Sequence, residues 1–182
     1  MAHELTTSYL RDSLSLFRYY KKLTERAMEQ VTDEELFAVL DGEMNSIAIM
    51  VKHLVGNMRS RWTDFLSSDG EKTDRKRDTE FESPPATRAA LMELWEEGWT
   101  YVFAALEPLS DADVERTVVI RGEPHSVMQA INRQITHYSY HCGQIVFLAK
   151  HLQSRQWKAL TVPKGKSEEF SQRVVAKEIS QR

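Results

Sequence analysis

The chain has 182 residues, and 41% of them are hydrophobic, which is enough to build the core of one domain. Its 27 acidic and 24 basic residues give a formal net charge of −3, so no basic excess indicates nucleic acid or an anionic membrane as a partner. No segment reaches the roughly 18 consecutive apolar residues of a membrane span, and Arg11 and Asp12 interrupt any signal peptide. The single cysteine, Cys142, excludes an internal disulfide. We therefore expect one soluble, cytoplasmic domain over residues 1–182.

Apolar residues recur at helical spacing along most of the chain, which predicts an all-α fold. Four long amphipathic helices imply a four-helix bundle over about residues 5–152. The expected helices cover about 5–30, about 45–66, a segment that begins at Ser83-Pro84 and carries apolar residues to Leu106, and about 126–152.

Two smaller elements accompany the bundle. The segment TVVIRGEPHSV, which includes Gly122 and precedes the last long helix, could form a small hairpin. Residues 153–182 form a C-terminal extension, in which Ser167 could cap a short helix that reaches Ile179.

A highly charged connector separates the second and third helices. Ten of the fourteen residues from Asp69 to Glu82 are charged, four of them basic and six acidic. Connections longer than about 12 residues in a compact domain are usually functional or disordered. One interpretation is a solvated connector. The other is a lid whose Arg75 or Arg77 contacts an anionic group of a substrate.

The segment THYSYHCGQI places His137 and His141 four residues apart within the last long helix. At about 3.6 residues per turn the two imidazoles lie on one face, where a single metal ion can reach both. Tyr138 follows the first histidine, where zinc proteases of the His-Glu-x-x-His type have their catalytic glutamate, so that class is excluded. Two histidines alone can also be ordinary helix residues, and a metal site needs a third donor.

His53, midway along the second helix, is the best candidate for the third donor, because helix bundles build sites from facing side chains. It shares a stripe with Ser46, Asn57, Ser60 and Asp64, about 120 to 140 degrees from the apolar stripe. We expect this polar stripe to lie outside the core and to line a water-accessible cleft. The alternative is that it simply faces solvent.

Other residues have simpler interpretations. Cys142 points to the apolar side of its helix, which favours a buried small side chain over a thiolate nucleophile. Trp95 and Trp99 are expected in the core or at a dimer contact.

With His53 on one helix and HYSYHCGQI on another, the sequence resembles the DinB/YfiT-like superfamily of four-helix proteins over about residues 5–152. Within it, HLVGNMRSRWTDFLSSDGEK, DRKRDTEF and WKALTVPKGKSEEF are similar to a subgroup of domains of unknown function. The resemblance implies that His53, His137 and His141 bind a divalent metal, often zinc or nickel, and that the protein is a homodimer. It also implies a thiol cosubstrate, because characterised relatives include S-transferases that use bacillithiol or mycothiol.

Three neutral imidazoles would leave a coordination position open, as in catalytic sites. We expect the ion to activate a thiol for transfer, or a water molecule for hydrolysis. Asn57 and Gln144 could orient ligands or substrate, and Arg133 could bind a substrate carboxylate. No carboxylate is placed as the general base. The alternative class is a metal-binding or stress-related interaction protein without turnover.

Overall fold

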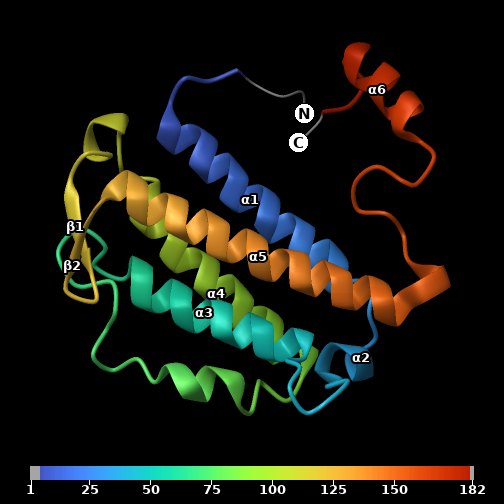
Figure 1. Ribbon diagram of the computed structural model, residues 1–182, viewed down its shortest axis with the longest axis horizontal. Helices are drawn as coiled ribbons and strands as arrows, with labels where there is room; N and C mark the ends of the chain where they lie inside the picture. The colour runs from blue at the N-terminus through green and yellow to red at the C-terminus, as the bar shows by residue number, and fades with distance from the viewer. Residues whose placement is uncertain (1–4, 181–182) are drawn as a thin grey trace.

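A computed structural model describes residues 5–180 and confirms the all-α class (Figure 1). The bundle helix α1 packs mainly against α5, and α3 packs against α4 and α5. The long helices are α1 (Tyr9–Met28), α3 (Ile47–Trp62), α4 (Arg88–Leu106) and α5 (Val127–Gln153). The short elements are α2 (Asp33–Phe37), α6 (Ser167–Val175) and the 3₁₀ turns η1 (Arg77–Phe81), η2 (Asp111–Asp113) and η3 (Ser154–Gln156).

Each long helix begins after a hydroxyl residue that caps it. The side chains of Ser8, Ser46, Thr87 and Ser126 each accept a hydrogen bond from a backbone N–H in the first turn of their helix. Such caps satisfy one of the N–H groups that have no partner within the helix. The caps therefore fix where α3 and α5, which carry the histidines, begin.

The predicted start of the third helix at Ser83 is wrong, because α4 begins at Arg88. Pro85 follows Pro84, and a residue that precedes proline is disfavoured in helical conformation. The chain therefore stays irregular until Thr87.

Two helices end earlier than the sequence predicted. The helix α3 ends at Trp62 rather than near Leu66, because Asp64 adopts a positive φ of 49°. The last helix, α6, ends at Val175 rather than at Ile179. Single residues at positive φ are a common way for a helix to terminate.

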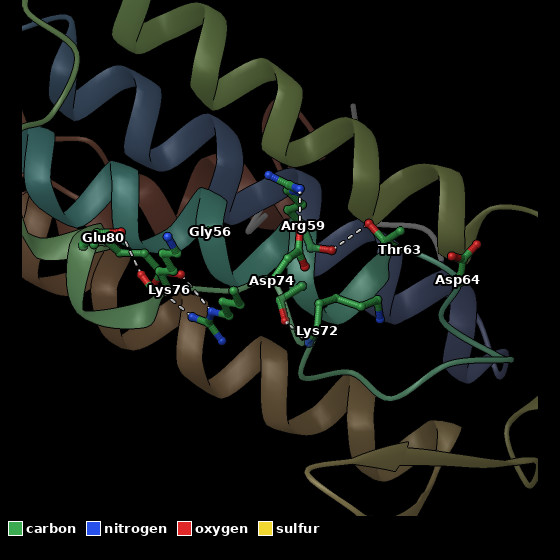
Figure 2. A pocket seen from close by; sticks show the side chains of 11 residues that line it. Gly56, Arg59, Thr63, Asp64, Lys72, Asp74, Lys76 and Glu80 are labelled. Atoms are coloured by element: carbon green, nitrogen blue, oxygen red, sulfur yellow. Dashed lines mark hydrogen bonds and ion pairs between the residues drawn. The ribbon is translucent and has the colours of Figure 1, made fainter.

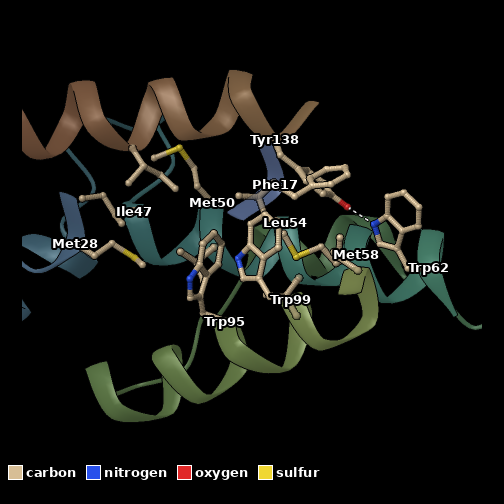
Figure 3. Packing of buried hydrophobic residues seen from close by; sticks show 14 of the residues in the cluster. Phe17, Met28, Ile47, Met50, Leu54, Met58, Trp62, Trp95, Trp99 and Tyr138 are labelled. Carbon is tan, nitrogen blue, oxygen red and sulfur yellow. Dashed lines mark hydrogen bonds between the residues drawn. The ribbon is translucent and has the colours of Figure 1, made fainter. Parts of the chain in front are cut away.

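Aromatic side chains fill the centre of the bundle (Figure 3). Phe17 lies against Trp62, Trp99 and Tyr138, with ring centroids 5.9, 6.2 and 5.7 Å apart. The indole N–H of Trp62 donates to the Tyr138 hydroxyl oxygen at 2.9 Å, which satisfies a buried donor. Trp95 and Trp99 are each 1% exposed, so both are core residues.

The expected hairpin is present between α4 and α5 and consists of β1 (Thr117–Ile120) and β2 (Glu123–Ser126) in antiparallel register. Its two turn residues, Arg121 and Gly122, both have positive φ, at 56° and 76°. Turns of this kind match the twist of paired strands. The carboxylate of Asp69 accepts the backbone N–H groups of both turn residues, at 2.8 and 2.7 Å. The hairpin thus fixes the start of the charged connector.

Among the helices of residues 5–180, none combines the length and apolar character that a bilayer span requires.

Candidate metal centre

Three histidines from two helices meet near the middle of the bundle. His53 projects from α3, and His137 and His141 project from α5. One potential ligand nitrogen of each lies within 4.8 Å of the other two. The Nε2 atoms of His53 and His137 are 3.3 Å apart, close to the roughly 3.3 Å between ligands of a tetrahedral ion with bonds of about 2.05 Å. The donor set therefore fits a divalent cation.

Glu80 fixes the orientation and tautomer of His53. Its carboxylate Oε2 lies 2.9 Å from Nδ1 of His53. A carboxylate can only accept a hydrogen bond, so Nδ1 of His53 carries a proton, and Nε2, which faces His137, is the atom that can bind a metal ion. Burial acts to raise the pKa of Glu80, but hydrogen bonds from His53 and Arg75 outweigh it, and the net pKa is lowered.

Gln144 orients His141 as Glu80 orients His53. Its side-chain Oε1 lies 2.7 Å from Nδ1 of His141, which leaves Nε2 of that ring available as a ligand atom. The sequence predicted that Gln144 could orient ligands or substrate, and in the structure its partner is the candidate ligand His141. Two of the three imidazoles are therefore held from behind by a hydrogen-bond acceptor.

The surroundings keep the two α5 histidines neutral. Burial, reinforced by the charges of His141 and His53, lowers the pKa of His137 to about 3. Burial and the charge of His53 lower the pKa of His141 to about 4, against a smaller opposite effect of its bond to Gln144. Neutral imidazole is the form that binds a metal ion.

The polar stripe of α3 is covered, which corrects the expectation that it lies outside the core. Four of its members, Ser46, His53, Asn57 and Ser60, are 1%, 4%, 5% and 2% exposed, whereas Asp64, beyond the end of α3, is exposed as expected. The connector between α3 and α4 runs beside α3 (Figure 1), and its η1 turn packs on that helix. A stripe that is polar in sequence can therefore be buried when another polar segment satisfies it.

Residues 76–79 and Glu82 of the connector are exposed, as the solvated interpretation predicts, but the side chains of Arg75 and Glu80 are buried, so that interpretation is wrong for these two residues. Arg75 donates from Nε and Nη2 to the two oxygens of Glu80, at 2.8 and 2.9 Å, and its side chain is only 5% exposed. Lys52 of α3 donates to the backbone carbonyls of Thr79 and Glu82, at 2.6 and 2.5 Å. These contacts hold Glu80 against His53.

Close approach of the connector to α3 depends on Gly56. A Cβ atom placed there would lie 2.4 Å from Oε1 of Glu80 and 2.6 Å from its Cδ. Such distances are far below normal contact, so any larger residue must displace the carboxylate. Phe81, the next residue along the connector, stacks on the His53 ring with centroids 4.6 Å apart.

A cavity of about 410 Å³ adjoins the histidines and is lined by His53, His137, Asn57 and Arg133 together with other residues. Its volume falls within the range of small-molecule sites. Asn57 Oδ1 accepts a hydrogen bond from the Tyr138 hydroxyl at 3.3 Å, so the amide is anchored to the core. Arg75 and Arg77, expected from the sequence to contact an anion, also line this cavity.

A second hollow of about 420 Å³ is lined in part by Arg75 and Glu80 (Figure 2). Its lining mixes both charge signs, and Arg59 is paired there with Asp74 at 2.9 Å. It contains none of the three histidines. The cavity beside the imidazoles is therefore the candidate site.

Comparison with known proteins places the fold. A crystal structure of a DinB-like protein from Bacillus cereus superimposes with a TM-score of 0.61 over 81% of this chain and 94% of that chain, at 18% sequence identity. The protein thus has the DinB-like fold, as the sequence predicted. The family model described as "Protein of unknown function (DUF1572)" matches residues 4–166, and the chain belongs to that family. No curated protein matches this sequence.

Glu80, Gly56 and Arg121 are components of the site that the sequence did not reveal. Glu80 is one of six acidic residues in the connector, and nothing in their spacing distinguishes it. Gly56, three residues after His53 within a predicted helix, was the available signal, because a glycine inside a helix often marks a close approach. Cys142 is buried, as the sequence predicted. The expected homodimer stays a prediction.

Proposed function

We propose that the protein is a metal-dependent enzyme in which His53, His137 and His141 hold one divalent ion, zinc or nickel, and that the ion activates a thiol for transfer to an electrophilic substrate. The observation that carries the proposal is the convergence of three imidazoles beside a cavity, with the outer nitrogens of His53 and His141 tied to Glu80 and Gln144. Ligands fixed from behind are typical of metal sites.

When bound, a divalent cation lowers the pKa of a thiol or water at its open position and so supplies a nucleophile at neutral pH. The residues of the chain prepare the rest. Asn57 is held by Tyr138 through its oxygen, which leaves its NH₂ group to donate to a substrate atom in the cavity. Arg133, on the same cavity wall, supports binding of a substrate carboxylate.

The same site could activate water instead, which would make the protein a hydrolase. In the transferase the S–H bond of the thiol breaks and a C–S bond forms at the electrophilic carbon, while the bond from that carbon to its leaving group breaks. The leaving group departs with the electron pair of that bond, and the thiol proton passes to it or to solvent. In the hydrolase water takes the place of the thiol. A metal-binding interaction protein would carry out neither reaction.

The metal is tested by elemental analysis of purified protein and of two variants. We expect one zinc or nickel ion per chain in the wild type and in His151→Ala, whose residue is exposed on the same helix, and a sharp loss in His53→Ala. Equal metal content in His53→Ala and the wild type would contradict the site.

The thiol is tested on cobalt-substituted protein titrated with bacillithiol and with cysteine. We expect a thiolate-to-cobalt charge-transfer band that saturates with added thiol, together with metal-dependent thermal stabilisation. Metal binding without any such band, but with turnover of ester or amide substrates, would favour the hydrolase. Neither a band nor turnover would favour the interaction protein.

A further inference from the structure

The candidate cavity is lined by an excess of arginine side chains. Five of them, contributed by α3, the connector, the hairpin and α5, surround the histidines, and no Asp or Glu among residues 5–180 lines the same cavity. The whole chain has a net charge of −3, so this concentration of positive charge is local. The five are Arg61, Arg75, Arg77, Arg121 and Arg133.

Three of these arginines are engaged within the protein. Arg61 and Arg121 donate to Glu71, at 2.9 and 3.0 Å, and Arg75 is paired with Glu80. Two carboxylates thus face three guanidinium groups. These arginines hold the connector and the hairpin together, and their positive charge is only partly neutralised.

The other two arginines have no carboxylate partner among the described residues. Arg133 is exposed on α5, one turn before His137, and makes no ion pair within residues 5–180. Arg77 lies over the ring of Phe81, with its guanidinium carbon 5.2 Å from the centroid. Stacking occupies the face of the guanidinium and leaves its N–H groups free to bind an anion.

We infer that the substrate or cosubstrate of this site is a small molecule with at least two anionic groups, either carboxylates or phosphates. Arg77 of the connector and Arg133 of α5 bind these groups. Five positive charges against two negative ones leave an excess of three, and one carboxylate would neutralise only part of it. A volume of about 410 Å³ limits the ligand to a small molecule. The assignment of this anion as a substrate rests on the proposed function.

The inference is tested by calorimetric titration of metal-stripped protein with acetate, with the tricarboxylate tricarballylate, and with pyrophosphate. We expect tricarballylate or pyrophosphate to bind at least about tenfold more tightly than acetate, with affinity that falls as salt rises. The stronger of the two identifies carboxylate or phosphate as the natural group. Binding no tighter than that of acetate would overturn the inference.

Variants locate the anion. Arg77→Gln and Arg133→Gln should each weaken the preferred polyanion by about fivefold to tenfold, whereas Arg155→Gln, an exposed arginine outside the cavity, should change nothing. Equal losses in all three variants would overturn the assignment. The titration uses metal-stripped protein, so its result does not depend on the metal. If the protein binds the polyanion but contains no metal as purified, the proposed function alone is refuted. If it contains metal but does not bind the polyanion, this inference alone is refuted.

Discussion

Replacement of Gly56 by alanine tests whether the connector positions His53. The new Cβ would lie 2.4 Å from Oε1 and 2.9 Å from Cγ of Glu80. Ordinary contacts between heavy atoms are about 3.5 to 4.0 Å, so the carboxylate must retreat by about 1 Å. Its hydrogen bond to His53, now 2.9 Å, would then exceed hydrogen-bonding distance.

Two effects of opposite sign follow from Gly56→Ala. Alanine within a helix stabilises it by about 1 kcal/mol relative to glycine. A hydrogen bond to a charged group contributes about 1.5 to 3 kcal/mol, and the bond between Glu80 and His53 is the one expected to be lost. We therefore expect the free energy of unfolding of the metal-free variant to be about 0.5 to 2 kcal/mol lower than that of the wild type. Loss of the group behind a metal ligand should weaken metal binding about tenfold to a hundredfold.

Gly143→Ala is the matched control, because a Cβ at this exposed position of α5 meets no atom within 4 Å. It should stabilise the metal-free protein by up to about 1 kcal/mol and leave metal affinity unchanged. Zinc affinity is measured by competition with a chromophoric chelator, and stability by urea unfolding. If Gly56→Ala binds zinc as tightly as Gly143→Ala, the argument that Glu80 positions His53 is refuted.

Three further predictions concern the surroundings of the site. The folded-state pKa of His137 is lowered from 6.5 to about 3, so the unfolded chain takes up a proton at higher pH than the folded protein does. The free energy of unfolding of metal-stripped protein should therefore fall as pH drops from about 6.5 toward 3, and this residue should contribute roughly 2 kcal/mol of that loss at pH 5. The decline should be shallower in His137→Gln. A pH-independent difference between the two proteins in urea unfolding would contradict this. Lys52→Met removes the hydrogen bonds to Thr79 and Glu82, so hydrogen exchange in the η1 turn should accelerate and zinc affinity should fall; unchanged protection would show that the turn is held by other contacts. Tyr138→Phe leaves the buried Trp62 N–H without its acceptor and should lower the free energy of unfolding by about 1 to 3 kcal/mol, so a difference within error would argue against this hydrogen bond.

The sequence predicted the helices well because their apolar stripes and caps are local signals. The starts of α3 and α5 follow from Ser46 and Ser126, which are readable in the chain. The predicted start of α4 was wrong because Ser83-Pro84 matches the usual sequence of a helix start. Pro85 disfavours the helical conformation of Pro84, so no helix begins there.

The site could be predicted only in part. The spacing of His137 and His141 indicates two ligands on one helix face, because helical geometry is local. Whether the polar stripe around His53 faces water depends on where the connector lies, and that is decided by contacts between residues far apart in the chain. The pairing of Glu80 with His53 spans 27 positions and has no counterpart in local pattern.

The composition of the connector predicted only part of its structure. A run in which most residues are charged usually indicates a solvated loop, and most of the residues from Thr73 to Glu82 are exposed. Arg75 and Glu80 are the exception, because their side chains pair with each other and can be buried without an unpaired charge. Only the structure distinguishes this buried pair from the solvated charges beside it.

X-ray absorption spectroscopy of the metal-loaded protein tests the central claim most directly. Convergence of His53, His137 and His141 predicts a shell of three imidazole nitrogens at about 2.0 to 2.1 Å from a zinc ion, with the characteristic outer-ring scattering, and two such imidazoles in any metal retained by His53→Ala. A spectrum without imidazole scattering, or one identical in His53→Ala and the wild type, would contradict it.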